Sequence, residues 1–280
     1  MIQKKSVVTT FNQSGYDKYG HKMIQSFIQN WPTDVTLYVY AEDCTVKESS
    51  VNLVIKDLYQ SSPALIEFKN KWRDVPKANG KISNDPVRGR RKDSRKEFKW
   101  DAVKFAHKVY AIFSCAEQCD ANTLIWMDAD TICHSPISLQ DLEKLVPTDM
   151  DLCYLGRKGK YSECGLYAMN LKSAHTKNFL KEFQRVYDQA ETGIFLMDEW
   201  HDSFVFDRVR EKFSQLKQLD WAANLYDLRP NPNNSIGEGH PLINTEWGEY
   251  LDHLKGARKT IGKSSQRDLI VKRKNTNYWS

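Results

Sequence analysis

The sequence predicts an α/β protein in which helices flank a mixed, mostly parallel sheet within a single domain. The 280 residues are 40% hydrophobic and 12% aromatic, which is enough apolar material for a large core. Short apolar runs of strand length alternate with amphipathic stretches of helix length, an order typical of β-α-β units. Neither an internal repeat nor a shift in composition marks an independent second unit.

The first seventy residues follow the order of parallel β-α-β units. Residues 6–11 form an apolar run, residues 18–31 are amphipathic, and residues 35–40 alternate apolar and polar side chains. A strand is also expected at residues 51–55 and a helix at residues 63–72. Because a helix between two strands returns the chain to the same end of the sheet, these strands should be parallel.

A polar segment at residues 74–96, rich in Pro, Gly, Lys and Arg, predicts a long irregular loop. Residues 97–119 then carry apolar side chains on one broad face, which predicts a long helix. This helix leads into an apolar strand at residues 123–127. Further helices are expected at residues 139–146, 177–189 and 203–213, further strands at 151–155 and 165–170, and a loop at 231–239.

The charge and composition exclude several classes of protein. Lysine and arginine total 41 against 36 aspartate and glutamate, and the basic run at residues 88–95 has no interleaved aromatics, so nucleic-acid binding is not expected. No run approaches the ~18 apolar residues of a membrane span, and the start lacks the apolar core of a signal peptide. The six scattered cysteines form no CxxC pair, which predicts free thiols. We therefore expect a cytoplasmic protein without a membrane span.

The strongest local signal is the pair Asp128 and Asp130 at the end of the strand at residues 123–127. In extended chain, residues two apart point to the same side, so both carboxylates can face one point. A divalent cation relieves their repulsion, and hard oxygen ligands favour Mg²⁺ or Mn²⁺ shared with substrate phosphates. Ligands of open α/β sheets also bind beyond the carboxyl ends of strands. The pair predicts a metal site for a nucleoside diphosphate; the alternative is that Asp128 only caps a turn.

The order of these features resembles the GT-A class of nucleotide-sugar glycosyltransferases over residues 6–263. Within that class it is most similar to the retaining, glycogenin-like group (glycosyltransferase family eight-like). The late His-x-x-Gly-x-x-Lys motif of that group resembles His253, Gly256 and Lys259 here, although Thr260-Ile261 replaces the Pro-Trp that follows it in the family. The resemblance implies a GT-A (Rossmann-like) fold and transfer of a hexose from a UDP-sugar donor to an unidentified hydroxyl acceptor, with retention of configuration.

The chemistry of the late motif agrees with this resemblance. An imidazole from His253 would complete a set of two carboxylates and one histidine, which favours Mn²⁺ over Mg²⁺ or Ca²⁺. Gly256 would let the backbone approach a phosphate, and Lys259 would neutralise the departing diphosphate. The alternative is a basic surface tail with an incidental histidine.

The resemblance also suggests where the nucleotide binds. The end of the first strand is expected to contact the base and ribose, and Asp43 to accept a hydrogen bond from uracil. The free N–H groups at the start of the long helix favour binding of a phosphate, and Lys99 and Lys104 lie there. The alternative is that this charged segment is a solvated loop. The residues expected to bind the nucleotide are Thr10, Phe11, Asp43, Lys99, Lys104, Ala129, Gly256 and Lys259.

Several acidic residues precede the helix expected at residues 203–213. Asp198, His201 and Asp202 have the i, i+3, i+4 spacing that places side chains on one helical face. Asp202 is the first candidate to orient the donor sugar or accept a proton, and Asp198 and Lys259 are the other catalytic candidates. An inverting enzyme would instead use Asp202 or Glu199 as a base. The alternatives are that an aspartate caps the helix and that His201 is a buried, hydrogen-bonded histidine.

The resemblance divides the chain into functional parts. Glu163 and Gly165 belong to the segment expected to line the donor sugar. The expected parts are a GT-A domain at residues 1–250, with a nucleotide-binding half at about 1–131 and an acceptor half at about 132–250, and a metal- and phosphate-binding segment with a basic tail at 251–280.

Two other functions are open. A sugar-phosphate nucleotidyltransferase uses a related sheet, but it typically has a Gly-rich phosphate loop after the first strand, and residues 11–20 have only isolated glycines. A catalytically inactive sugar-binding or scaffold protein is the second. The presence of Asp128, Asp130, His253 and Lys259 argues against it.

Overall fold

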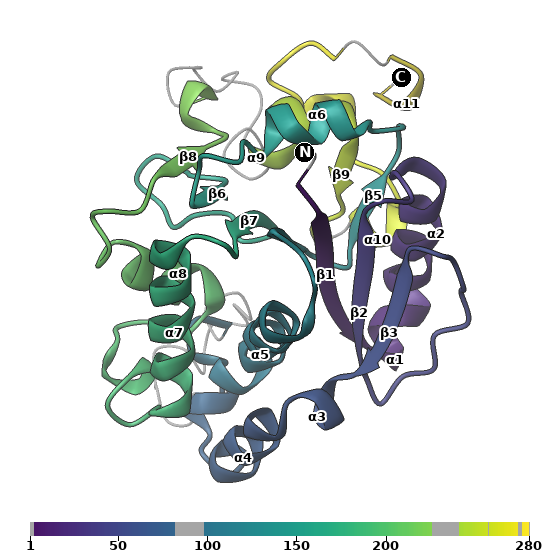
Figure 1. The fold of residues 1–280 in the computed structure, drawn as a ribbon. Helices are drawn as coiled ribbons and strands as arrows, with labels where there is room; N and C mark the ends of the chain where they lie inside the picture. The colour runs from purple at the N-terminus through teal and green to yellow at the C-terminus, as the bar shows by residue number, and fades with distance from the viewer. Residues whose placement is uncertain (1–2, 82–97, 226–240, 257, 274–275, 280) are drawn as a thin grey trace.

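A computed structural model describes residues 3–81, 98–225, 241–256, 258–273 and 276–279 (Figure 1). The loop expected at residues 231–239 lies outside the described residues, as does most of the loop expected at residues 74–96. Its described beginning contains a short 3-10 turn, Lys77–Asn79.

A seven-stranded sheet forms the centre of the fold, with the order β3-β2-β1-β4-β7-β6-β8. The first four strands in this order are parallel, β7 is antiparallel to β4 and β6, and β8 is parallel to β6. The predicted mixed, mostly parallel sheet is confirmed. The strands are β1 (Lys5–Asn12), β2 (Thr36–Glu42), β3 (Leu53–Asp57), β4 (Thr123–Met127), β6 (Leu152–Tyr154), β7 (Leu166–Asn170) and β8 (Gln218–Asp220).

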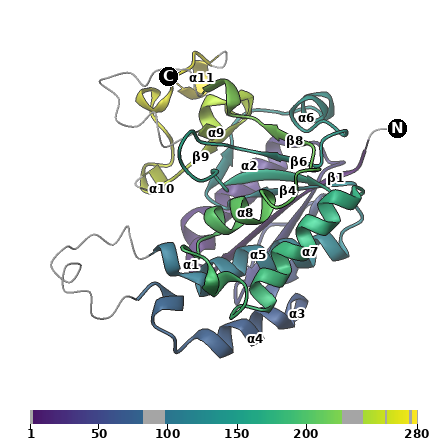
Figure 2. The same ribbon diagram turned by 90° about the vertical axis from the view of Figure 1, so that its left-hand side faces the viewer.

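Helices cover both faces of this sheet (Figures 1 and 2). Alternation along β4 explains the two cores, because Leu124 and Trp126 pack on one face while Ile125 and Met127 pack on the other. The first layer contains α4 (Pro63–Trp72), α5 (Ala102–Gln118), α7 (Ala174–Asp188) and α8 (Asp202–Arg210), and the second contains α2 (His21–Asn30), α6 (Leu139–Leu145) and α9 (Pro241–Asn244).

Short strands and single helical turns make up the rest of the described regular structure. Single turns and the three-residue strands at residues 131–133, 218–220 and 251–253 carry too little periodicity for the sequence to predict them. The short elements are α1 (Gln13–Gly15), the π-helical turn η1 (Tyr16–Gly20), α3 (Leu58–Ser61), β5 (Thr131–Cys133), η4 (Ile194–Leu196), η5 (Ala223–Leu225), η6 (Glu246–Glu249), β9 (Leu251–His253), α10 (Arg258–Ile261), η7 (Gln266–Asp268) and α11 (Thr276–Trp279).

Strands β5 and β9 form a separate antiparallel pair that brings the late part of the chain to the metal-binding candidates. Thr131 pairs with His253, so the histidine lies next to the chain that leaves Asp130. The tail beyond β9 packs onto the second core, where Trp279 is buried. Residues from 251 onward are therefore part of the same packed body.

Helix α5 begins later than the sequence predicts, and helix α8 begins one residue earlier, at Asp202 and not at residue 203. Helix α5 begins at Ala102 and not at residue 97, because the side chain of Asp101 caps it by accepting from the Lys104 amide at 3.3 Å. Helix α8 begins at Asp202, and the His201 ring is its cap. The backbone is extended at Met197 and at His201, so the expected helical face shared by Asp198, His201 and Asp202 does not form.

Two expectations from composition can be compared with the fold. All six cysteines are free thiols, as predicted, and Cys115 lies in the first core. Among the described residues, no helix is both long enough and apolar enough to cross a membrane.

Candidate active site

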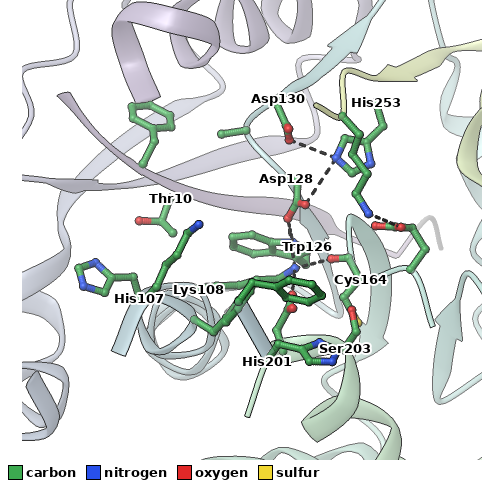
Figure 3. A pocket seen from close by; sticks show the side chains of 18 of the residues that line it. Thr10, His107, Lys108, Trp126, Asp128, Asp130, Cys164, His201, Ser203 and His253 are labelled. Atoms are coloured by element: carbon green, nitrogen blue, oxygen red, sulfur yellow. Dashed lines mark hydrogen bonds and ion pairs between the residues drawn. The ribbon is translucent and has the colours of Figure 1, made fainter. Parts of the chain in front are cut away.

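A cavity of about 750 Å³ opens where the parallel strands end. The carboxyl ends of β1, β2 and β4 meet at this edge of the sheet, and the antiparallel β7 begins there. The amide of Asp128 donates to the Gly165 carbonyl at 2.8 Å, which ties the end of β4 to the start of β7. Figure 3 shows the side chains that converge on this space.

Asp128, Asp130 and His253 form one cluster, as the sequence predicts. Each offers one ligand atom within 4.8 Å of the others, and His253 Nε2 lies 3.1 Å from Asp130 Oδ1 and 3.5 Å from Asp128 Oδ2 (Figure 3). The turn after β4 positions the carboxylates, and the β5–β9 pair positions the imidazole. Two carboxylates and one imidazole nitrogen fit a divalent cation of the Mn²⁺ or Mg²⁺ type.

Lys259 adds a cation to this cluster. Its Nζ lies 2.7 Å from Asp130 Oδ2 and 4.8 Å from the centre of the Tyr19 ring. Burial opposes ionisation of Asp130, but the charges of His253 and Lys259 outweigh it and hold the pKa of this carboxyl well below its ordinary value. Burial likewise opposes protonation of His253, yet the carboxylates raise its pKa. Asp130 is therefore an anion that contacts both His253 and Lys259.

Another buried carboxylate, Glu163, lies beside His253. It forms an ion pair with Lys255 and lies 3.7 Å from Arg157 Nη1. Burial alone would raise the pKa of Glu163, but Lys255, His253 and Arg157 together lower it to about 2. Glu163 is thus a permanent anion that anchors Lys255 beside the metal-binding candidates.

Gly165 is where the backbone passes closest to His253. A β-carbon there would overlap the imidazole, at 2.6 Å from Nδ1, so only glycine lets the ring face both carboxylates. Gly165→Ala should displace His253, lower the affinity for Mn²⁺ at least about tenfold and destabilise the fold by about 1–3 kcal/mol. Titration calorimetry with Mn²⁺ and urea unfolding measure the two effects.

Gly193→Ala is the matched control for this prediction. A β-carbon at Gly193 would overlap the Val186 carbonyl oxygen, far from the cluster. This variant should lose comparable stability with unchanged Mn²⁺ affinity. Equal Mn²⁺ affinity in the Gly165→Ala protein would contradict the role assigned to the glycine.

Lys108 is a cavity residue that the sequence did not point to. It lies on α5 with 8% of its surface exposed, and its Nζ binds Asp128 Oδ1 at 3.1 Å and Asp202 Oδ2 at 2.7 Å (Figure 3). It also donates to the Cys164 carbonyl and lies 4.8 Å from the Trp126 ring centre. Burial opposes its charge, but the two carboxylates outweigh burial and raise the pKa of Lys108 well above its ordinary value. A lysine in an amphipathic helix ordinarily indicates a solvated face, so only its neighbours reveal this burial.

Thr10 and Phe11, at the end of β1, line the cavity, but Asp43 does not. Asp43 is exposed and has a left-handed backbone with φ of 47°, so its side chain leaves the sheet edge. Glu42, one residue earlier, faces the cavity. Its carboxylate accepts from Thr10 Oγ1 at 3.0 Å and lies 2.6 Å from His107 Nδ1. The structure thus places Glu42 in the cavity and Asp43 outside it, and Glu42 was not identified from the sequence.

The expected acidic cluster before α8 separates into two environments. Asp202 is buried and lines the cavity. Asp198 is exposed and lines a different, shallower depression, while its carbonyl accepts from Trp100 Nε1 at 3.1 Å. The expectation that Asp198 joins Asp202 at the site is wrong, because the chain between them is extended.

Glu199 and His201 form a hydrogen-bonded pair in the same wall. Glu199 Oε2 lies 2.9 Å from His201 Nε2, and Oε1 accepts from Lys99 and from the Tyr161 hydroxyl. Burial lowers the pKa of His201, and the nearby carboxylates of Asp202 and Glu199, which would raise it, do not outweigh burial. His201 is thus the buried, hydrogen-bonded histidine of the alternative interpretation.

The remaining nucleotide candidates differ in their placement. Lys99, Lys104 and Ala129 line the cavity, and the Lys99 ammonium forms an ion pair with Glu199. Gly256 does not line the cavity. Its φ of 61° is the left-handed conformation that favours glycine, and a β-carbon at this position would contact no other atom.

Comparison with known proteins gives matches only at the level of structure. No family model matches the chain, and no curated protein matches it. The solved structures that resemble it include the apo form of the bifunctional glycosyltransferase WbbM (TM-score 0.45, 11% identity, 79% of this chain and 39% of that one). They also include the apo glycosyltransferase GlyE of Streptococcus pneumoniae TIGR4 (TM-score 0.45, 12% identity, 78% of this chain and 45% of that one). A third is the galactosyltransferase LgtC with donor and acceptor sugar analogues (TM-score 0.43, 13% identity, 77% of this chain and 72% of that one).

These structural neighbours are glycosyltransferases, the class that the sequence resembles. This chain spans less than half the length of the first two. The case for a function therefore rests on the geometry of the cavity.

Proposed function

We propose that this protein is a metal-dependent glycosyltransferase that moves a hexose from a nucleoside diphosphate, UDP in the first instance, to a hydroxyl acceptor. The single observation that carries the proposal is the meeting of Asp128, Asp130 and His253 with Lys259 at one wall of the cavity. A volume of about 750 Å³ suits a nucleotide sugar. A set of anionic and cationic groups at one wall suits a metal-bound diphosphate.

Asp128, Asp130 and His253 would hold Mn²⁺ or Mg²⁺. When bound, such a cation supplies Lewis-acid stabilisation of the charge that develops on the diphosphate as its bond to the sugar breaks. Lys259 would add a fixed cation for the same leaving group, and Lys255 a second one. Interactions that strengthen as charge develops act on the transition state more than on the bound donor.

The rest of the cavity would orient the donor and the acceptor. Glu42 can accept a hydrogen bond from a base N–H, which uracil offers at N3, and Thr10 and Phe11 lie beside it. Asp202 would orient the donor sugar, because Lys108 holds it alongside Asp128. In this proposal residues 1–131 supply most of the nucleotide site, residues 132–250 the acceptor side, and the segment from residue 251 the late metal and phosphate ligands.

The test is ligand-induced thermal stabilisation with UDP, GDP and ADP, each with Mn²⁺, with Mg²⁺ and with EDTA. UDP with Mn²⁺ should stabilise the protein, by about 2.7 kcal/mol at a hundred times its dissociation constant, and EDTA should abolish the effect. A preference for nucleoside triphosphates would indicate a nucleotidyltransferase. No response to any nucleotide would indicate a scaffold and contradict the proposal.

Retention of configuration is the second part of the proposal. In either stereochemical course the bond from the anomeric carbon to the diphosphate breaks, a bond to the acceptor oxygen forms, and the acceptor proton is released. Proton NMR of the first product from an α-linked donor should show an α-linkage. A β-linked product would instead indicate inversion, with Asp202 or Glu199 as the base.

A further inference from the structure

A buried carboxylate outside the cavity lies directly beside His253. Asp252 is fully buried, and its Oδ2 accepts from the Ser264 amide and from the Tyr278 hydroxyl, both at 2.7 Å. Its Oδ1 accepts from Ser264 Oγ at 2.6 Å. We name these three residues the Asp252 clasp. None of them lines the cavity.

The Asp252 clasp joins the two ends of one loop. Asp252 and Ser264 are 12 residues apart, and residues 253–263 between them contain both lysines assigned to the diphosphate. Lys255 forms an ion pair with Glu163, whose charge interacts with His253, and Lys259 forms one with Asp130. A single loop therefore delivers two cations to the metal-binding candidates.

Beyond Leu254, which is buried, the described residues of this loop have little apolar packing of their own. None of the residues of α10, which lies within it, is buried, and Ile261 is 73% exposed. Its shape depends on left-handed glycines, Gly256 with φ of 61° and Gly262 with φ of 83°. Because a loop without a core is ordered mainly by how its ends are fixed, hydrogen bonds at the ends decide where its side chains lie.

A second set of hydrogen bonds also fixes this loop. Arg258 Nε, inside the loop, donates to Asp268 Oδ2 at 2.9 Å, and Asp268 is buried. Asp268 also accepts from the Ser265 amide at 2.9 Å, one residue beyond the clasp. Asp268, which follows the loop, therefore fixes both Arg258 inside the loop and the chain just beyond it.

We propose that the Asp252 clasp is a positioning device that orders residues 253–263 so that Lys255 and Lys259 meet the donor diphosphate. Asp252, Ser264 and Tyr278 are positioning residues, and they act through the lysines. The inference rests on the proposed function for the identity of the ligand, but not for the ordering of the loop.

Tyr278 offers a clean way to weaken the clasp. Its ring stacks on His134 with centroids 3.9 Å apart and planes at 9°, so Tyr278→Phe removes the hydroxyl and keeps the stack. Tyr110→Phe is the matched control, because the Tyr110 hydroxyl also donates to a carboxylate, Asp188, at 2.7 Å, on the face of the sheet that carries α7. Ser264→Ala removes a second donor to Asp252.

The experiment compares these variants by urea unfolding, by calorimetry with UDP and Mn²⁺, and by amide hydrogen exchange. Tyr278→Phe and Tyr110→Phe should lose comparable stability. Only the clasp variants should bind UDP with Mn²⁺ more weakly, by about tenfold in the double variant Tyr278→Phe/Ser264→Ala. Exchange should quicken in residues 253–263 of the clasp variants and stay unchanged there in Tyr110→Phe.

The outcomes separate this inference from the proposed function. Unchanged UDP affinity together with unchanged exchange in residues 253–263 overturns the positioning role. If the unmodified protein binds no UDP, the proposed function fails, and exchange alone then decides whether the clasp orders the loop. Faster exchange throughout the protein, and not only in this loop, also overturns the inference.

Discussion

Replacing Asp130 with asparagine is expected to abolish Mn²⁺-dependent binding of UDP and to slow sugar transfer by roughly a hundredfold to a thousandfold. Asp130 is the central member of the cluster, since its two oxygens contact His253 and Lys259. Asparagine keeps the volume but removes the charge. The variant therefore loses a metal ligand and the anion that holds the leaving-group lysine in place.

The measurement is calorimetric titration with Mn²⁺ and UDP, combined with a transfer assay on the donor identified by thermal stabilisation. Asp151→Asn is the matched control, because Asp130 and Asp151 are both 7% exposed and Asp151 accepts from the Lys217 amide at 2.8 Å outside the cavity. The control should bind UDP normally. Normal Mn²⁺ affinity in Asp130→Asn would refute the assignment of the metal site.

Replacing Lys108 with methionine is expected to destabilise the protein by about 3 kcal/mol as well as to impair transfer. The substitution keeps the contact with Trp126 but leaves Asp128 and Asp202 without their shared cation. Breaking a buried ion pair by removing one partner is strongly destabilising, because the remaining charge stays buried and uncompensated. Both carboxylates lose this cation here: Asp202 is buried, whereas Asp128 is partly exposed and keeps His253 and Trp126 Nε1 as partners.

Urea unfolding measures the effect, and a second variant isolates its cause. Lys108→Met/Asp202→Asn removes one of the two stranded charges, so it should be more stable than Lys108→Met alone. Lys104→Met, one turn earlier on the same helix and exposed, should change the free energy of unfolding by less than about 0.5 kcal/mol. A double variant no more stable than Lys108→Met would show that the loss comes from packing and not from charge.

Local patterns in the sequence predicted most of the regular structure. The strands of the sheet and the long helices follow from apolar spacing, which is a property of contiguous residues. Asp128 and Asp130 were identifiable because they follow a buried strand closely, although it is the turn after β4, and not extended chain, that brings their carboxylates together. His253 entered through a motif that resembles a known family, 123 residues away from Asp130.

The errors arose where one residue of register decides which way a side chain points. Asp43 and Glu42 are neighbours, and the left-handed turn at Asp43 sends one carboxylate into solvent and leaves the other in the cavity. Asp198 and Asp202 have helical spacing, but the helix begins only at Asp202. Such starts depend on caps and contacts that a spacing rule does not contain.

The sequence by itself determined an α/β fold, its main strands and helices, and a pair of carboxylates at a strand end. Tertiary structure alone decided that Lys108 is the buried cation between Asp128 and Asp202, and that Gly165 admits the His253 ring. The physical reason is that hydrophobic periodicity is a property of contiguous residues. The burial of a charge, and the close approach of a backbone to a ring, depend on residues that are far apart in sequence.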